Sequence, residues 1–192
     1  MQEIAMMAES IEPCRRCQRR RWLGQTDPMD IDVIQGDITR QQVDAVVNAA
    51  NAGMRGGGGV DGAIHAAGGP TILADCIRRF PGGLPTGQAG WTTAGDLPAR
   101  WVIHVVGPIH GRGDRRQLDS CYAHALAVAD DLGATSIAFP LVSAGAYGWP
   151  LEDAARAAVE TLRATPTKVE RCVLVGYSRQ TAAVLRRALA RQ

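Results

Sequence analysis

The stretch Val46–His65, which reads VVNAANAGMRGGGGVDGAIH, constrains the fold and the function of this chain more than any other. It predicts a buried strand, then a loop with four consecutive glycines, then the start of a helix. Such a glycine run costs backbone entropy and is expected where something must approach the backbone closely. A glycine-rich turn that leads into a helix N-terminus presents N–H groups to an anion such as phosphate. A flexible surface loop is the alternative, but the flanking Asn51 and Asp61 are more than such a loop requires.

The glycine loop is not a common nucleotide-binding loop, because it lacks the Lys-Ser/Thr pair of a P-loop and the spaced glycines of a dinucleotide fingerprint. Six segments follow one another in a recognisable order: GDIT at Gly36–Thr39, VNAAN at Val47–Asn51, GGGGVDGAIH at Gly56–His65, PTG at Pro85–Gly87, LPARWVIHVVGP at Leu97–Pro108 and FPLVSAGAYGWP at Phe139–Pro150. In these segments the chain resembles the macrodomain family, in particular its branch of ADP-ribosyl hydrolases and O-acetyl-ADP-ribose deacetylases. The resemblance covers the chain from about Ile31 to the C-terminus. It implies a macrodomain over residues 29–192, preceded by a basic extension over residues 1–28.

Composition sets wide bounds on the class of protein. The chain has 192 residues, 46% of them hydrophobic and 21% charged, which is ordinary for one globular domain with its own core. The net charge of +2 argues against electrostatic binding to nucleic acid or to a membrane. No apolar run approaches the roughly 20 residues of a membrane span, and the first residues lack the core of a signal peptide. We therefore expect a cytoplasmic protein, and a monomer.

The cysteines predict no disulfide framework and no complete metal site. Five is an odd number, and a cytoplasmic chain keeps its thiols reduced. Cys14 and Cys17 form one CxxC, whereas a zinc site needs four ligands and the histidines are not paired at ligand spacing. A half-site shared across a dimer stays an alternative. Cys76, Cys121 and Cys172 lie in apolar patterns and are expected to be core thiols.

Residues 1–28 differ from the rest of the chain. Five arginines fall between Arg15 and Arg21, without the period of a helix or a strand. A poorly ordered basic arm is the expected structure. A contact with nucleic acid or with a protein partner is the alternative.

The order of the predicted elements indicates an α/β fold. Sequence patterns predict strands over residues 31–35, 44–49, 89–93, 101–106, 136–140 and 171–177, and helices over residues 61–68, 70–79, 115–132, 150–164 and 178–191. Their alternation predicts helices packed on a central sheet; with the resemblance it implies a three-layer α/β/α sandwich with a central mixed β-sheet. The loops after Val47 and Phe139 are expected at the carboxyl edge of that sheet, where open α/β sheets bind ligands.

The second glycine-bearing loop, Leu141–Pro150, has the pattern of another anion site. Gly145 and Gly148 allow close backbone approach, and the helix that follows directs its positive dipole end at the same anion. The resemblance implies that this loop wraps the pyrophosphate of ADP-ribose, with ligand contacts from Ser143, Ala144, Gly145, Ala146, Tyr147 and Trp149. The family usually has Phe or Tyr where Trp149 stands, and core packing is the alternative role of this indole.

The remaining ligand contacts follow from the resemblance residue by residue. It implies that Asp37 binds the adenine amino group beside the Ile38 backbone, and that Tyr177 packs on the adenine. It assigns further ligand contacts to Asn48, Gly57, Gly58, Gly59 and Val60. Two alternatives stay open: Asp37 as the cap of the next turn, and Asn48 as a buried tie between loops.

The implied reaction is the hydrolysis of a group attached to the distal ribose of ADP-ribose. A carboxylate can activate water as a general base and an Asn can orient the ribose or the water, so Asp61 and Asn51 are the predicted catalytic pair. Neither a cofactor nor a metal is predicted. Because acyl esters of ribose are labile, positioning and one base could suffice. The expected partners are ADP-ribose, proteins mono-ADP-ribosylated on Asp or Glu, and O-acetyl-ADP-ribose.

Several alternatives remain at this point. A non-catalytic reader of ADP-ribose would keep the phosphate loops, and a phosphatase acting on ADP-ribose 1″-phosphate would use the same pocket. The chain also departs from many relatives, which have a leucine pair where Met54 and Arg55 stand. Arg55 is expected to point to solvent, with a phosphate contact as the alternative. His104, in the middle of a predicted strand, is expected to be a satisfied core residue rather than a catalyst.

Overall fold

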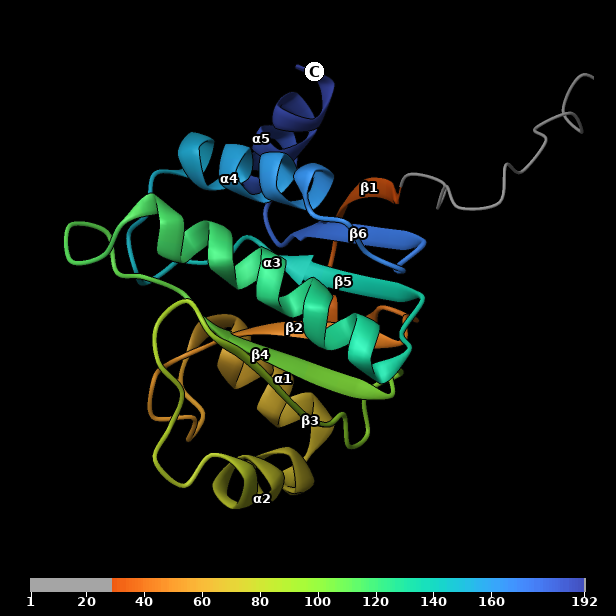
Figure 1. The fold of residues 1–192 in the computed structure, drawn as a ribbon, viewed down its shortest axis with the longest axis vertical. Helices are drawn as coiled ribbons and strands as arrows, with labels where there is room; N and C mark the ends of the chain where they lie inside the picture. The colour runs from red at the N-terminus through yellow and green to blue at the C-terminus, as the bar shows by residue number, and fades with distance from the viewer. Residues whose placement is uncertain (1–28, 192) are drawn as a thin grey trace, which may run out of the picture.

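The computed structural model describes residues 29–191, which form a six-stranded sheet covered by helices (Figure 1). The elements in chain order are β1 (Asp30–Gln35), the 3-10 helix η1 (Ile38–Arg40), β2 (Ala45–Ala50), α1 (Gly59–Gly68), α2 (Pro70–Arg79), β3 (Ala89–Thr93), β4 (Trp101–Val106), α3 (Arg115–Leu132), β5 (Ser136–Pro140), α4 (Leu151–Ala164), β6 (Arg171–Gly176) and α5 (Arg179–Ala190). The predictions for residues 1–28, including the Cys14–Cys17 pair, lie outside the described residues.

The sheet has the order β1-β6-β5-β2-β4-β3. All neighbouring strands are parallel except β3, which pairs with β4 in the antiparallel sense at the edge of the sheet. The sheet is therefore mixed, as predicted. Because the parallel strands run in one direction, the loops that follow β2, β4, β5 and β6 all leave from the same edge.

Two hydrophobic cores, one on each face of the sheet, give the molecule three layers. On one face α1 and α2 pack through Ile64, Ile72 and Cys76 against residues such as Val46. On the other face α3, α4 and α5 pack against residues such as the neighbouring Val47. Successive residues of a strand point to opposite faces, so β2 supplies both cores, and all of its residues except Asn48 are apolar. The predicted α/β/α sandwich is confirmed (Figure 1).

Several element boundaries differ from the prediction by one or two residues, and one of them matters for the site. Helix α1 begins at Gly59 rather than at Asp61, with Gly58 as N-cap. Gly59 has a φ of 60°, a left-handed conformation that glycine adopts without strain. Asp61 therefore lies within the first turn of the helix. Helix α4 begins after Pro150, and β6 ends at Gly176.

Within residues 29–191, no helix combines the length and the apolar character that a membrane crossing needs.

Asp44 ties the start of β2 to the start of β5. Its Oδ2 accepts hydrogen bonds from the backbone N–H and the hydroxyl of both Thr135 and Ser136, at 2.9–3.0 Å. Burial acts to raise the pKa of this carboxyl, but the four hydrogen bonds outweigh burial, and the pKa is lowered. The ionised carboxylate therefore stabilises the central part of the sheet.

Replacing this carboxylate by an amide, Asp44→Asn, should lower the free energy of unfolding by about 1–3 kcal/mol at pH 7, because a charged acceptor is lost. The carboxyl pKa is lower in the folded chain, so its contribution is present above the ordinary value of roughly 4 and disappears as the pH falls through the folded value. Urea unfolding at several pH values measures the difference. A gap between wild type and variant that stays constant down to pH 3 would contradict this assignment.

Candidate functional site

A cavity of about 740 Å³ opens at the carboxyl edge of the sheet. It lies between the loop that leads from β2 into α1 and the loop that leads from β5 into α4, as the sequence predicted. Fourteen of the predicted site residues line it: Asp37, Ile38, Asn51, Gly57, Gly58, Gly59, Val60, Asp61, Ser143, Ala144, Gly145, Ala146, Tyr147 and Tyr177. Two do not, Asn48 and Trp149.

One wall of the cavity is the N-terminus of α1. The first N–H groups of a helix have no partner within the helix, and Gly58 offers no side-chain cap. Gly57, Gly58 and Gly59 line the cavity without side chains, so the backbone itself forms this surface. Together with the positive end of the helix dipole, these groups form a surface suited to an anion.

The opposite wall is formed by residues 141–150. Hydrogen bonds to buried groups hold this loop in place. Val142 N–H donates to the buried Tyr122 hydroxyl at 3.1 Å, and Trp149 N–H donates to the Ser143 carbonyl at 3.0 Å. Ser143 has a φ of 62°, which a residue with a side chain rarely adopts, and its buried hydroxyl has no hydrogen-bond partner in the structure. A Cβ on Gly107 would come 2.2 Å from that hydroxyl oxygen, so glycine is required there. These constraints preform the wall.

Asp61 and Asn51 both line the cavity beside the glycine loop. A Cβ on Gly57 would lie 3.0 Å from Asp61 Oδ2 and 3.2 Å from Asn51 Nδ2, so both side chains approach the same point of the glycine loop. Asn51 Nδ2 donates to the Gly56 carbonyl at 2.7 Å, and Asn51 Oδ1 accepts from Gly53 N–H at 3.0 Å. The amide therefore shapes the loop as well as lining the cavity.

The Asp61 carboxylate is 4% exposed and is held through one oxygen. Oδ1 accepts from Asn48 Nδ2 at 2.6 Å and lies 3.4 Å from His65 Nε2, one helical turn further along α1. Oδ2 is buried and has no hydrogen-bond partner in the structure. A buried acceptor without a partner is costly, so its presence in the wall of a cavity suggests a ligand or a water that uses it.

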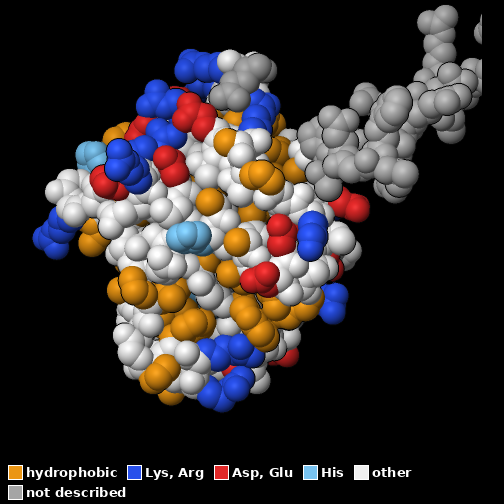
Figure 2. Space-filling model, in the orientation of Figure 1, with side chains coloured by type: hydrophobic (Ala, Val, Ile, Leu, Met, Phe, Trp, Pro, Cys, Tyr) orange, Lys and Arg blue, Asp and Glu red, His pale blue; other side chains and the backbone are white. Residues whose placement is uncertain are grey.

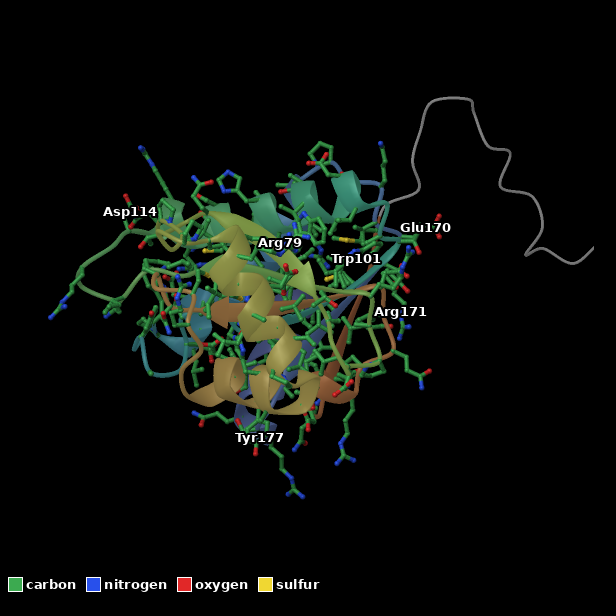
Figure 3. All side chains as sticks on the ribbon, turned by 90° about the horizontal axis from the view of Figure 1, so that it is seen from below. Arg79, Trp101, Asp114, Glu170, Arg171 and Tyr177 are labelled. Carbon is green, nitrogen blue, oxygen red and sulfur yellow. The ribbon has the colours of Figure 1, made fainter. Side chains whose placement is uncertain are left out.

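The far end of the cavity is lined by Asp37, Ile38 and Tyr177. Asp37 caps η1: its Oδ1 accepts from Thr39 N–H at 2.9 Å and from the Thr39 hydroxyl at 2.7 Å. These two bonds lower the pKa of the carboxyl. Oδ2 lies 3.7 Å from the exposed Arg40 Nε. This oxygen can still accept a hydrogen bond from a ligand. Tyr177 is 85% exposed and stands at the surface (Figure 3).

Two predicted ligand contacts are corrected by the structure. Asn48 is fully buried beneath the cavity, where it binds Asp61 and His104, so the alternative role as a buried tie holds. Trp149 is 6% exposed and belongs to the core on the α3 side of the sheet, with its ring edge-on to His110 at 5.4 Å between centroids. Core packing is the role of this indole, whose N–H is bound by Asp153 on α4.

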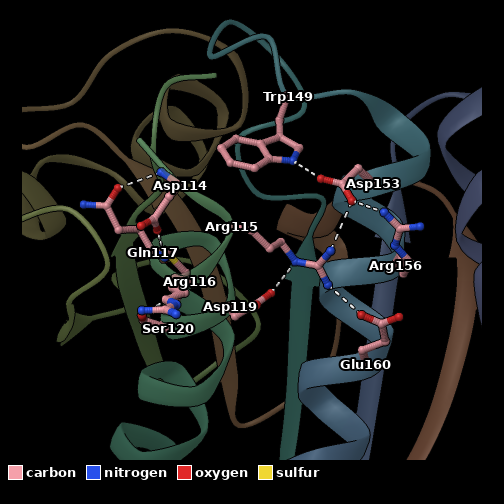
Figure 4. A network of polar contacts seen from close by, with 11 residues as sticks. Asp114, Arg115, Arg116, Gln117, Asp119, Ser120, Trp149, Asp153, Arg156 and Glu160 are labelled. Carbon is pink, nitrogen blue, oxygen red and sulfur yellow. Dashed lines mark hydrogen bonds and ion pairs between the residues drawn. The ribbon is translucent and has the colours of Figure 1, made fainter. Parts of the chain in front are cut away.

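Trp149 is hydrogen-bonded to an ion-pair network centred on Asp153 and Arg115 (Figure 4). The indole N–H donates to Asp153 Oδ2 at 2.8 Å, and Asp153 also pairs with Arg156 and, at 3.1 Å, with Arg115. Burial acts to raise the pKa of Asp153, but the indole and the two guanidinium groups lower it. Arg115 extends the network to Asp119 on its own helix and to Glu160 on α4. The loop between β5 and α4 is thus anchored by charges outside the cavity.

Ten further residues line the cavity that were not predicted from the sequence. Most of them lie near the ends of strands and the starts of helices that the patterns did predict, and they are Gly36, Ala49, Ala50, Ala63, Gly107, Pro140, Leu141, Leu151, Val175 and Thr181. The signal that could have found them is their position, directly after the predicted strands at the carboxyl edge of the sheet.

Arg55 is exposed, as expected, and its side chain also makes contacts within the protein. Its guanidinium donates to the carbonyls of Gly53, Met54, Phe80 and Pro81 at 3.1–3.2 Å. It therefore ties the glycine loop to the turn that follows α2.

Three potential metal ligands, His65, Cys76 and His104, come together beneath α1, with one donor atom of each within 4.8 Å of the others. They come from α1, α2 and β4, so their spacing along the chain could not predict the group. Both ring nitrogens of His104 are engaged, with Thr92 Oγ1 at 2.8 Å and Asn48 Nδ2 at 3.0 Å. Burial raises the pKa of the Cys76 thiol to about 11, which keeps it protonated. We interpret the group as a hydrogen-bonded core cluster.

A second, more open hollow of about 520 Å³ lies between α2 and the edge of the sheet. Figure 2 shows basic and hydrophobic side chains over this part of the molecule. The Arg79 guanidinium lies 3.6 Å from the ring centroid of Trp91, and that of Arg100 lies 4.1 Å from the centroid of Trp101. Asp75 already pairs with Arg79 at 3.0 Å. None of the predicted site residues lines this hollow, so the cavity at the carboxyl edge is the candidate site.

Comparison with known sequences agrees with the motifs. The family model described as Macro domain matches residues 47–158. A macro domain-containing protein of Streptomyces nogalater is 59% identical, over 73% of this chain and 81% of that protein. A Klebsiella pneumoniae protein named O-acetyl-ADP-ribose deacetylase is 48% identical, over 83% of this chain and 95% of that protein.

Solved structures agree with the fold. A variant of the Oceanobacillus iheyensis macrodomain, solved with ADPR, superposes with a TM-score of 0.80 at 34% identity, covering 85% of this chain and 93% of that one. A Trypanosoma brucei macrodomain in complex with ADP-ribose superposes with a TM-score of 0.78 at 36% identity, covering 83% of this chain and 69% of that one.

The Trp149–Asp153 hydrogen bond should be measurable by a double-mutant cycle. Trp149→Phe removes the indole donor, and Asp153→Asn removes the charge that accepts from it. We expect a coupling free energy of about 1–3 kcal/mol between the two changes, because the bond involves a charged acceptor. Urea unfolding of the wild type, both single variants and the double variant measures it. Additive effects of the two substitutions would show that the bond does not anchor the loop.

Proposed function

This chain belongs to the macrodomain family, and we propose that it is a hydrolase that binds ADP-ribose and removes ester-linked groups from its distal ribose. The substrates proposed are O-acetyl-ADP-ribose and proteins mono-ADP-ribosylated on Asp or Glu. Support comes from the relatives named O-acetyl-ADP-ribose deacetylase and from the family structures solved with ADP-ribose. It comes also from the two anion-directed walls of the cavity.

One observation favours an enzyme over a protein that only binds ADP-ribose. The Asp61 carboxylate is buried in the cavity wall beside Asn51, with one oxygen held and the other without a hydrogen-bond partner. A reader of ADP-ribose has no need of an unpartnered buried carboxylate, whose cost is not offset by any contact within the protein. A general base has that need, because its free oxygen must accept a proton from water.

The cavity suggests an order of contacts along the ligand. Adenine would lie at the end lined by Asp37 and Tyr177, with the Asp37 Oδ2 atom accepting from the exocyclic amine. The diphosphate would lie between the N-terminus of α1 and the loop of residues 141–150. The distal ribose would then reach Asn51 and Asp61. Such a placement fits the glycine wall, which lines the cavity without side chains.

In the proposed reaction a water molecule attacks the carbonyl carbon of the ester while Asp61 accepts the water proton. The tetrahedral intermediate collapses, and the bond between the acyl carbon and the ribose oxygen breaks. The ribose oxygen leaves as a hydroxyl, taking the proton back from Asp61. The products are ADP-ribose and a carboxylic acid, either acetate or the side chain of the modified protein. Asn51 would orient the ribose, and a diphosphate oxygen of the substrate is a second candidate for accepting the proton.

The variant Asp61→Asn tests the role of the carboxylate, because the amide can still accept from Asn48 but cannot act as a base. We expect kcat to fall by at least about 100-fold, as is typical when a general base is lost. The measurements are acetate release from O-acetyl-ADP-ribose and ADP-ribose release from a protein modified on Glu or Asp. ADP-ribose affinity, measured by calorimetry, should change little.

The exposed Asp131 at the end of α3 provides the matched control, since Asp131→Asn makes the same chemical change far from the cavity. It should behave as wild type. Tight binding of ADP-ribose by wild type, with no release of acetate or ADP-ribose from either substrate, would contradict the enzyme proposal. The protein would then be a non-catalytic reader of ADP-ribose.

The adenine end is tested by Asp37→Asn. The new amide keeps an oxygen for the Thr39 cap but presents N–H groups in place of Oδ2, which would oppose the adenine amine. We expect ADP-ribose to bind about tenfold more weakly, the loss of roughly one hydrogen bond to a charged acceptor. Calorimetry with ADP-ribose and with its hypoxanthine analogue separates the two effects, because the analogue presents a carbonyl there and should lose no affinity. An equal loss for both ligands would contradict adenine reading by Asp37.

A further inference from the structure

A buried chain of side chains runs from the edge of the sheet to the proposed general base. Thr92 on β3, His104 on β4, Asn48 on β2 and Asp61 on α1 are each buried. Thr92 Oγ1 lies 2.8 Å from His104 Nε2, Asn48 Nδ2 lies 3.0 Å from His104 Nδ1, and the same Nδ2 lies 2.6 Å from Asp61 Oδ1. Asn48 is paired with His104 in the parallel register of β2 and β4, so the strands themselves set this contact.

The hydrogen bonds between these four buried side chains allow one consistent placement of protons. A carboxylate only accepts, so the Asn48 amide directs one N–H at Asp61 and its second N–H at His104 Nδ1. His104 Nδ1 must then be the acceptor, and its proton sits on Nε2, from which it is donated to Thr92 Oγ1. The Thr92 hydroxyl donates in turn to the Thr93 carbonyl at 3.0 Å. This tautomer is inferred from the hydrogen-bond network.

The surroundings of His104 keep the ring neutral. Burial is the main cause that lowers its pKa to about 3, and the nearby His65 ring lowers it further, while Asp75 acts in the opposite direction. A protonated ring would point an N–H at the Asn48 amide and break the contact. The neutral ring therefore maintains the acceptor that Asn48 requires.

These hydrogen bonds determine how the Asp61 carboxylate is oriented. Asn48 directs one N–H at Asp61 and the other at His104, so the amide is held at two points. Without the His104 acceptor one buried N–H of Asn48 would lose its partner, and the bond to Asp61 alone would hold the amide. The Asp61 carboxylate would then be fixed less firmly, with its free oxygen Oδ2 less well placed.

Building on the function proposed above, we propose that His104 is a positioning residue, which fixes the Asp61 carboxylate through Asn48 and so leaves Oδ2 as the free acceptor. His104 touches no substrate in this arrangement. Its effect is on the orientation of the base, so its loss should lower kcat rather than the affinity for ADP-ribose.

Two near-isosteric neutral variants separate this role from packing. In His104→Asn the amide oxygen takes the place of Nδ1 and can still accept from Asn48. In His104→Gln the polar atoms lie one bond further out, at the position of Nε2, so the contact with Thr92 is kept and the acceptor for Asn48 is lost. Both variants remove the ring from the same core, and both should lower the melting temperature.

We expect kcat for O-acetyl-ADP-ribose to fall roughly tenfold to 100-fold in His104→Gln, because misplacing a catalytic group by about 1 Å has effects of that size. His104→Asn should keep most of the wild-type kcat, and the ADP-ribose Kd should be unchanged in both. Leu126→Ala, in the core on the other face of the sheet, controls for loss of stability alone and should keep its kcat. An equal loss of kcat in the Asn and Gln variants, or no loss in either, would overturn the proposal.

A second measurement does not depend on activity. The Asn48 side-chain amide protons, followed by 15N NMR on the full chain, should exchange slowly with solvent in wild type and in His104→Asn, and faster in His104→Gln. Equal protection in all three proteins would overturn the proposal. If wild type hydrolyses neither substrate, the proposed function fails, and the exchange measurement still decides whether His104 positions Asp61.

Discussion

The parallel pairing of β2 with both β4 and β5 is the constraint on which the site depends. It sends the loops that follow β2 and β5 to one edge of the sheet, where the backbone of each forms a wall of the cavity. The same register sets Asn48 beside His104 beneath that edge. Because β2 contributes apolar residues to both faces, its position at the centre of the sheet is stabilised by two hydrophobic cores. Asn48 within the strand and Asn51 directly after it are therefore held by a rigid element.

The fold could be predicted from the sequence because its local signals agree with one another. Strands with continuous apolar runs, such as the one that ends at Pro140, and helices opened by Pro or Ser, such as the one after Ser178, were placed to within two residues. The start of α1 was set too late, at Asp61, because a run of glycines carries no helical period. Gly59 begins the helix since its positive φ joins the loop to the first turn. That shift brings Asp61 into the turn whose N–H groups face the cavity.

The site could be predicted less completely, because side-chain direction depends on partners distant in the sequence. Trp149 was expected in the cavity, but Asp153 accepts from its indole and draws the ring into the core. Asn48 was expected to touch ligand, but Asp61 and His104 take both of its N–H groups. Arg55 is exposed as expected, but the four carbonyls that converge on its guanidinium were not predicted. No local pattern in the sequence announces such convergence.

In the buried polar side chains beneath the cavity, one feature that lowers the stability of the fold is also the one that the proposed reaction uses. An unpartnered oxygen on Asp61 destabilises the folded protein, since a buried acceptor without a hydrogen bond costs about 1–3 kcal/mol. A second donor in place of a hydrophobic neighbour would remove this cost and would also remove the free acceptor. The structure instead satisfies one oxygen through Asn48, satisfies Asn48 through a neutral His104, and ends the chain on a backbone carbonyl. Every N–H and O–H donor along this path is used, and the atoms left without a partner on it are two acceptors, Asp61 Oδ2 and the Asn48 side-chain oxygen.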